Sequence, residues 1–259
     1  EVLYTANGYA RYRIHAQVAG ATPVPAPDRD FRADVDALLE RVNARTRVVA
    51  LANPDNPSGL YTPAAEVRRL HAGLPASCIL LLDCAYAEYV ERDDYELPVE
   101  LVHESPNVVM TRTFSKVHGL AGLRLGWMYG PPALIDAVAK VGPSFPVSSP
   151  AIEIGIAALA DEEHVRVSVE HNTRWRDWFT ARMEALDLHV YPSQTNFLLM
   201  RFGDRGGCSA EAAFQHWLGR GIIARRIAAP AFADCVRISI GSEAAMRAAA
   251  DSMTAFLHR

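Results

Sequence analysis

The feature that most restricts the fold is a continuous apolar run, Ile79–Leu82, which ends directly in Asp83. A strand with one face in water alternates apolar and polar residues, whereas a strand covered on both faces does not. This run therefore predicts a strand buried on both faces of a parallel sheet. Short runs of the same kind, each predicted to be a strand, are Val2–Tyr4, Thr22–Val24, Val48–Ala52, Val108–Met110 and Leu123–Tyr129.

Helical patterns lie between these runs. Asp34–Arg45 carries apolar residues at i, i+3, i+4 and i+7, which predicts a helix with one buried face. Gly8–Ala19 is expected to form a short helix closed by Gly20, and another helix is expected to begin at Thr62 as N-cap with Pro63 in its first turn. Strands that alternate with helices predict an α/β fold, with a mostly parallel central sheet and helices on both faces.

The sequence pattern changes after residue 146, where segments predicted to be helices, with mixed apolar and polar residues, dominate. We therefore predict two domains, a large α/β domain over residues 1–146 and a smaller C-terminal α+β domain over residues 147–259. Gly203–Gly207 is expected to be a surface turn. The elements expected in the second domain are helices at Glu162–Leu186, at Ser209–Leu218 and from Glu243, and strands at Leu188–Tyr191, Asn196–Arg201, Ile222–Arg226 and Val236–Ile240.

Composition narrows the classes of partner. A net charge of -4 over 259 residues gives no basic footprint for nucleic acid or for an anionic membrane, so small-molecule partners are favoured. The longest apolar runs fall far short of the about 20 residues that span a bilayer. Four cysteines without C-x-x-C spacing, and a start unlike a signal peptide, indicate a reduced, cytoplasmic protein. The nine histidines show no metal-ligand spacing, and no dinucleotide or P-loop motif is present.

The stretch Thr111–Gly130 gives the strongest indication of chemical function, because its Lys116 lies among apolar and glycine residues rather than in a polar, helix-forming sequence. Desolvation disfavours the ammonium form and leaves a free amine that attacks carbonyl groups, so Lys116 is predicted to be a Schiff-base lysine. Arg124, Ser115 and Thr113 could together clamp a phosphate. The alternative is a solvated loop lysine with an ordinary strand-end arginine.

Several motifs in one order resemble the fold-type-I pyridoxal-phosphate aminotransferases, and most closely the histidinol-phosphate aminotransferases. The resemblance covers essentially the whole chain. Two departures stand beside expected site residues: Cys84 replaces the usual Glu of D-E-A-Y, and Asn7-Gly8 replaces the usual Pro-Thr. The motifs are NPDNPSG (53–59), DCAYAEY (83–89), TFSKVHGLAGLRLGW (113–127), SQTNFLLMRF (193–202), GRGIIARR (219–226) and VRISIGS (236–242).

The resemblance implies pyridoxal 5'-phosphate as the cofactor and assigns the catalytic residues. Lys116 would hold the cofactor covalently and shuttle the proton at the substrate α-carbon. Asp83 would pair with the ring nitrogen and keep it protonated, and Tyr86 would donate to the ring oxygen beside Asn56. Local chemistry alone leaves open a helix N-cap for Asp83 and a turn former for Asn56.

The remaining cofactor contacts are also implied by the resemblance. Ser115, Arg124 and Thr113 map onto phosphate contacts. Tyr9 maps onto the aromatic residue that stacks on the cofactor ring, with a packed core tyrosine as the alternative.

Arg237 is a charge inside an otherwise apolar strand and needs a partner or a ligand to offset its desolvation. The resemblance implies that it binds the substrate phosphate and the carboxylate of the co-substrate. Arg225 is expected to be a second arm, with Arg226 as the competing assignment and a solvated strand-end arginine as the alternative for either.

The implied reaction is transamination between histidinol phosphate and 2-oxoglutarate or glutamate by a homodimer. The alternatives are an aromatic-amino-acid or prephenate aminotransferase, a decarboxylase or lyase on the same cofactor, and a non-catalytic relative. The sequence begins at Glu1 with residues that already resemble a β-strand. It is therefore expected to lack an N-terminal part that in the family supplies phosphate donors and a tyrosine for the partner subunit.

Overall fold

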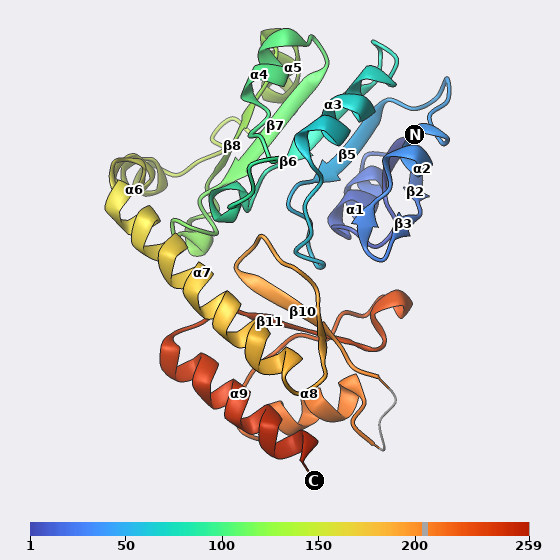
Figure 1. Cartoon of the computed structure of the whole chain (residues 1–259). Helices are drawn as coiled ribbons and strands as arrows, with labels where there is room; N and C mark the ends of the chain where they lie inside the picture. Colours follow the sequence, from blue (N-terminus) through green and yellow to red (C-terminus); the bar gives the residue numbers. More distant parts are fainter. Residues whose placement is uncertain (204–206, 259) are drawn as a thin grey trace.

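A computed structural model describes residues 1–203 and 207–258 and contains a large sheet and a small sheet, drawn one above the other in Figure 1. The large sheet has the strand order β2-β1-β5-β6-β7-β8. Every neighbouring pair in it is parallel except β7 and β8, so the predicted mostly parallel sheet is confirmed. Its strands are β1 (Val2–Thr5), β2 (Pro23–Ala26), β5 (Val48–Ala52), β6 (Ile79–Asp83), β7 (Val108–Thr113) and β8 (Gly126–Tyr129).

The two faces of the large sheet are covered unequally. On one face, Leu80 and Leu82 pack with side chains from three helices in one buried cluster. On the other face Leu81 and Ala52 pack against the first helix, and Leu81 remains partly exposed. The predicted burial of Ile79–Leu82 on both faces is therefore correct for only one of them. The helices are α1 (Arg11–Val18) on the second face, and α2 (Val35–Leu39), α3 (Ala64–Ala72) and α4 (Val99–Glu104) on the first.

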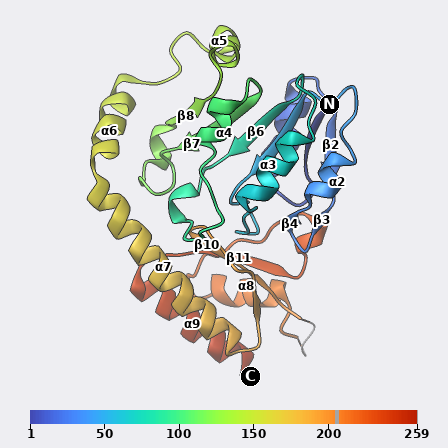
Figure 2. The same ribbon diagram turned by 45° about the horizontal axis from the view of Figure 1, so that its top comes forward.

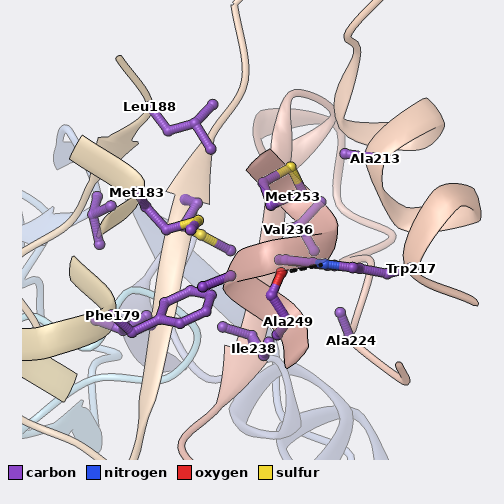
Figure 3. Close-up of a cluster of buried hydrophobic side chains, with 14 of the residues drawn as sticks. Phe179, Met183, Leu188, Ala213, Trp217, Ala224, Val236, Ile238, Ala249 and Met253 are labelled. Atoms are coloured by element: carbon purple, nitrogen blue, oxygen red, sulfur yellow. Dashed lines mark hydrogen bonds between the residues drawn. The ribbon is translucent and has the colours of Figure 1, made fainter. Parts of the chain in front are cut away.

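The small sheet has the order β11-β10-β9 and is antiparallel. Its side chains and three helices enclose a second core, in which Trp217 and Phe179 have 0% exposure. The indole N–H of Trp217 donates to the carbonyl oxygen of Ala249 at 3.0 Å, which satisfies the one polar group of that ring (Figure 3). The elements are β9 (His189–Val190), β10 (Phe197–Arg201), β11 (Cys235–Ser239), α7 (Glu162–Glu184), α8 (Ala210–Leu218) and α9 (Glu243–Leu257).

The helix α7 runs along one side of the molecule from the level of the large sheet to the small one (Figures 1 and 2). The side chain of Asp161 caps its first turn by accepting from the backbone N–H of His164. At Thr173 and Arg176 it is tied to Glu91 of the large half by hydrogen bonds of 2.8 and 3.1 Å. The remaining elements are β3 (Asp28–Arg29), β4 (Arg32–Ala33), α5 (Pro132–Val141), α6 (Ser149–Ala160) and the short 3-10 turns at Ala87–Tyr89, Ala121–Leu123 and Pro230–Phe232.

Several predicted boundaries were wrong. The strand predicted from Leu123 begins only at Gly126, because Ala121–Leu123 forms a 3-10 turn and Arg124 adopts a left-handed conformation. The helix predicted over Asp34–Arg45 ends at Leu39. The predicted cap at Thr62 was also displaced by one residue, since Pro63 holds the N-cap position.

Other predictions met a mixed outcome. The strand predicted at Ile222–Arg226 is reduced to a single bridge between Arg225 and Arg237. Residues 204–206 of the predicted turn at 203–207 lie outside the described residues. The predicted domain boundary at residues 146 and 147 falls between α5 and α6 and stays a prediction.

Candidate active site

A cavity of about 380 Å³ lies where β5, β6 and β7 reach their carboxyl ends. Pockets that hold a small ligand have volumes in this range, and parallel sheets bind ligands at this edge. All eight residues predicted to contact the cofactor line it. Its lining is Tyr9, Ala52, Pro54, Asn56, Asp83, Ala85, Tyr86, Thr111, Arg112, Thr113, Ser115, Lys116, Ala121 and Arg124.

Lys116 lies in a turn directly after β7. Gly119 closes this turn with a backbone hydrogen bond to the carbonyl of Lys116 and with φ of +69°, a conformation that glycine adopts without steric cost. The amine Nζ lies 5.0 Å from the centroid of the Tyr86 ring. Burial lowers the pKa of Lys116, and the positive charges of Arg237 and Arg124 lower it further. The lysine is thereby biased towards the free amine that attacks a carbonyl.

Asp83 is the last residue of β6 and lines the same cavity as Lys116. Burial raises the pKa of its carboxyl group, while hydrogen bonds from Tyr12 and from the backbone N–H of Ala85, and the charge of Lys116, oppose that rise. The two donors lie 3.2 Å from the carboxylate oxygens. The site therefore holds an acidic group away from solvent with donors that favour its ionised form.

Asn56 joins two predicted site residues. Its amide nitrogen donates to the hydroxyl of Tyr86 at 3.4 Å, and its Oδ1 accepts from Nη1 of Arg237 at 2.5 Å. Burial raises the pKa of Tyr86 to about 12, so the phenol keeps its proton. Since Asn56 lies in the loop after β5 and Arg237 lies on β11, this hydrogen bond links the two sheets.

Arg237 does not line the cavity itself, but it stands beside it. Its guanidinium carbon lies 4.5 Å from the centroid of the Phe197 ring, and its Nε is buried without a hydrogen-bond partner among the described residues. Burial lowers the pKa of Arg237, so its charge is poorly solvated. A buried guanidinium with an unused donor is suited to bind an anionic ligand group.

Arg225 and Arg226 have different surroundings. Arg225 is exposed, and its backbone exchanges hydrogen bonds of 2.8 and 2.9 Å with that of Arg237. The side chain of Arg226 donates to the carbonyls of Cys235 and Ala233 and pairs with Glu211. The side chain of Arg226 is thus already paired with groups near the small sheet. Arg225 makes no side-chain hydrogen bond or ion pair within the described part of the chain.

The residues expected to bind phosphate lie together at the end of β7. The Oγ of Ser115 accepts a long, 3.5 Å hydrogen bond from Nη1 of Arg124, which also donates to the carbonyl of Ala121 at 2.6 Å. The hydroxyl oxygen of Thr113 accepts from the backbone N–H of Ser115 at 3.1 Å. Each of these side chains keeps at least one donor for an incoming anion.

Asp55 is a buried carboxyl group that the sequence did not single out. Although the residue as a whole is partly exposed, its Oδ1 is buried and has no hydrogen-bond partner among the described residues. Its Oδ2 accepts from the hydroxyl of Ser58 at 3.0 Å. Burial raises the pKa of Asp55 to about 7, and the charge of Asp28 adds to the rise.

Two further residues near the cavity were missed by the sequence analysis. Tyr12, on α1, reaches Asp83, and its ring makes an edge contact with Tyr9 at 5.5 Å between centroids. Arg112 lines the cavity and forms a largely buried ion pair with Glu88. For Tyr12, the sequence offered one indication, which is its spacing of three residues, about one helical turn, from the predicted site residue Tyr9.

The donor set fits pyridoxal 5'-phosphate. The cavity offers an amine for the aldehyde, a carboxyl group for the ring nitrogen and a cluster of hydroxyl and guanidinium donors for the phosphate. Within residues 1–203 and 207–258, no group of three or more His, Cys, Asp or Glu side chains is arranged to hold a metal ion.

Comparisons with known proteins agree with this architecture. The chain matches the family described as aminotransferase class I and II over residues 1–253. It is 43% identical over 259 residues to the histidinol-phosphate aminotransferase of Nitrobacter winogradskyi, a match that covers 100% of this chain and 71% of the relative. The protein of the same name from Nitrobacter hamburgensis is 44% identical over 257 residues, with 99% of this chain and 70% of the relative covered.

Solved structures match as well. The crystal structure of histidinol-phosphate aminotransferase from Sinorhizobium meliloti in complex with pyridoxal-5'-phosphate superposes with a TM-score of 0.91 at 31% identity, over 99% of this chain and 70% of that one. L-threonine-O-3-phosphate decarboxylase from Porphyromonas gingivalis has a TM-score of 0.82 at 20% identity, over 100% of this chain and 77% of that one, which shows a common fold.

The fold is therefore that of the fold-type-I pyridoxal-phosphate-dependent transferases. More narrowly, the chain belongs to the aminotransferase class I and II family.

Proposed function

We propose that this chain is a pyridoxal-phosphate-dependent aminotransferase of histidine biosynthesis, which moves an amino group between histidinol phosphate and 2-oxoglutarate or glutamate. The observation that carries the proposal is the presence of Lys116 and Asp83 in one cavity, with three anion-binding side chains at its edge. The substrate follows from the relatives, which bear the name histidinol-phosphate aminotransferase at 43% and 44% identity.

The residues of the cavity divide the chemistry between them. When bound, pyridoxal 5'-phosphate supplies a ring that accepts the electron pair left at the substrate α-carbon. Lys116 holds the cofactor and then, as a free amine, takes and returns the α-carbon proton. Asp83 would hold a proton at the ring nitrogen, and Tyr86 and Asn56 would orient the ring by hydrogen bonds to its oxygen.

The outer residues bind and orient. Ser115, Thr113 and Arg124 would hold the cofactor phosphate, and the ring of Tyr9 would stack on the cofactor ring. Arg237 binds the phosphate of histidinol phosphate in one half-reaction and a carboxylate of the second substrate in the other, with Arg225 as a second arm. Both substrates present an anion at the same place, so one guanidinium serves both.

A panel of amino donors tests this proposal. Purified protein loaded with pyridoxal phosphate is offered histidinol phosphate, phenylalanine, tyrosine and aspartate, and formation of glutamate from 2-oxoglutarate is measured. We expect the highest kcat/KM with histidinol phosphate. Preference for an aromatic donor would support an aromatic-amino-acid or prephenate aminotransferase instead, and release of carbon dioxide from an amino acid would support a decarboxylase.

We further propose that the protein works as a homodimer. An apolar groove of about 490 Å³ lies open on the surface, between β8 and α6, and Trp127, Phe145, Ile152 and Ile156 in its lining are exposed. Exposed apolar patches of this kind mark interaction surfaces. Sedimentation analysis should give a dimer, and Ile156→Asp should shift the population towards monomer; a wild-type monomer at micromolar concentration would contradict the proposal.

We also propose a cytoplasmic location. The structure contains no helix long and apolar enough to cross a bilayer within the described residues. Its four cysteines are all free, as is usual in a reducing compartment. Fractionation of cells that express the protein, with a cytoplasmic and a periplasmic marker, tests this location directly.

A further inference from the structure

Asp83 depends on a tyrosine that lies far away in the sequence. The hydroxyl of Tyr12 donates to Oδ2 of Asp83 at 3.2 Å, across 71 residues of sequence. Tyr12 has 8% exposure and belongs to the small cluster that α1 forms on its face of the large sheet. Leu81 of the same cluster stands two residues before Asp83, and side chains two apart along a strand share a face. The position of α1 therefore brings the phenol to the carboxylate.

No strong ion pair supports Asp83. Among the described residues, no lysine or arginine nitrogen approaches its carboxylate within 4.0 Å, so the hydrogen bonds to it come from the neutral donors Tyr12 and the Ala85 backbone. The second of these belongs to the chain turn that follows β6 and is present whatever side chains surround it. Tyr12 is accordingly the only side chain in the described part of the molecule that donates to this carboxylate.

The protonation states of both groups suit this arrangement. Burial is the largest influence on Asp83 and raises its pKa, and the Tyr12 hydrogen bond is the largest influence that opposes this rise. Burial, followed by the charge of Asp83, raises the pKa of Tyr12 well above its ordinary value, so the phenol stays protonated and acts only as a donor. Loss of this donor would move Asp83 towards its neutral form.

We infer that Tyr12 is a positioning residue for the amino-transfer reaction, whose hydroxyl keeps the Asp83 carboxylate ionised and oriented so that the cofactor ring nitrogen retains its proton. This inference rests on the proposed function, because it requires pyridoxal phosphate in the cavity with its ring nitrogen against Asp83. Tyr9 lies just before this helix, and its ring meets that of Tyr12 edge-on at 83°, so the start of α1 contacts both a cavity wall and the acid behind it.

The first test is spectroscopic. Wild-type protein and Tyr12→Phe, which keeps the ring and removes only the hydroxyl, are loaded with pyridoxal phosphate labelled with 15N at the ring nitrogen. At a pH of about 7.5, we expect the wild-type 15N resonance at the position of a protonated ring. In Tyr12→Phe it should move towards that of a neutral pyridine.

The second test is kinetic. Loss of a hydrogen bond to a charged group predicts a roughly ten- to hundredfold fall in kcat for Tyr12→Phe. KM for the amino donor should change much less, because Tyr12 is not among the residues that line the cavity. Tyr4→Phe is the matched control, since Tyr4 is a buried tyrosine of the same cluster and makes no hydrogen bond to Asp83. It should leave both the 15N resonance and kcat near the wild-type values.

A double-mutant cycle decides whether Tyr12 acts through Asp83. In an Asp83→Asn background, Tyr12→Phe should cost little further activity. Additive losses, or an unshifted 15N resonance in Tyr12→Phe, would overturn the inference while leaving the aminotransferase proposal intact. Failure of the wild-type protein to retain pyridoxal phosphate or to transfer an amino group would instead overturn the proposed function itself.

Discussion

Arg237 and Asn56 are joined by a 2.5 Å hydrogen bond although 181 residues separate them in the sequence. Through Asn56 the guanidinium is linked to Tyr86, and Tyr86 lies under the amine of Lys116. A group proposed to bind the substrate anion is thus in contact with groups proposed to bind the cofactor. Substrate charge and cofactor orientation are therefore expected to influence each other at this position.

The first prediction concerns this arginine. Arg237→Gln removes the charge and should raise KM for histidinol phosphate roughly ten- to hundredfold, because a charge-assisted hydrogen bond to the substrate is lost. Steady-state kinetics with varied donor concentration measures the effect. Arg182→Gln, at an exposed position of α7, is the control and should leave KM unchanged. An unaltered KM in Arg237→Gln would remove Arg237 from the substrate site.

The second prediction concerns Lys116. Reduction of the loaded protein with borohydride, followed by digestion and mass spectrometry, should place the pyridoxyl group on Lys116. The sequence contains only one other lysine, Lys140, which is exposed on α5. A label on Lys140 would end the assignment, and Lys116→Ala should yield no reduced adduct at all.

The third prediction concerns Asp83. Asp83→Ala should lower kcat by several orders of magnitude, because the ring nitrogen loses the charge that keeps it protonated. The protein should still bind the cofactor covalently through Lys116, which absorbance spectra and borohydride trapping report. Near-normal turnover in this variant would contradict the proposed role.

The fourth prediction concerns the pH dependence of stability. The raised pKa of Asp55, about 7, means that the folded protein keeps a proton that the unfolded chain loses above about pH 4. The free energy of unfolding should therefore fall as pH rises from about 4 to 7, by up to about 1.4 kcal/mol per pH unit from this group, and level off above pH 7.

The fourth prediction is checked by comparing wild type with Asp55→Asn in thermal unfolding at intervals from pH 5 to pH 8. Asn cannot titrate, so the stability of wild type relative to this variant should decrease with rising pH. Asp251→Asn, at an exposed position of α9, is the matched control. A pH-independent difference between wild type and Asp55→Asn would show that the carboxyl group is ionised in the folded protein throughout.

The sequence predicted much of the sheet and of the cavity lining, for identifiable reasons. Apolar runs mark strands, and polar residues directly after them, such as Asp83, fall at the ligand-binding edge. Tyr12 could not be found in this way, because its role depends on how α1 packs over the sheet. The strand predicted over Leu123–Tyr129 extended too far, because Leu123 and Leu125 continue the apolar run although the chain turns at Arg124.

Arg124 has φ of 55° and ψ of 39°, a region in which a side chain costs about 1 kcal/mol and glycine costs nothing. The loop thus has a residue that its backbone disfavours, and that residue extends a cation to the cavity edge. We expect Arg124→Gly to raise the melting temperature of the cofactor-free protein while weakening cofactor retention. A search for heat-resistant variants that measured only the melting temperature of the cofactor-free protein would therefore select substitutions at this position that impair cofactor binding.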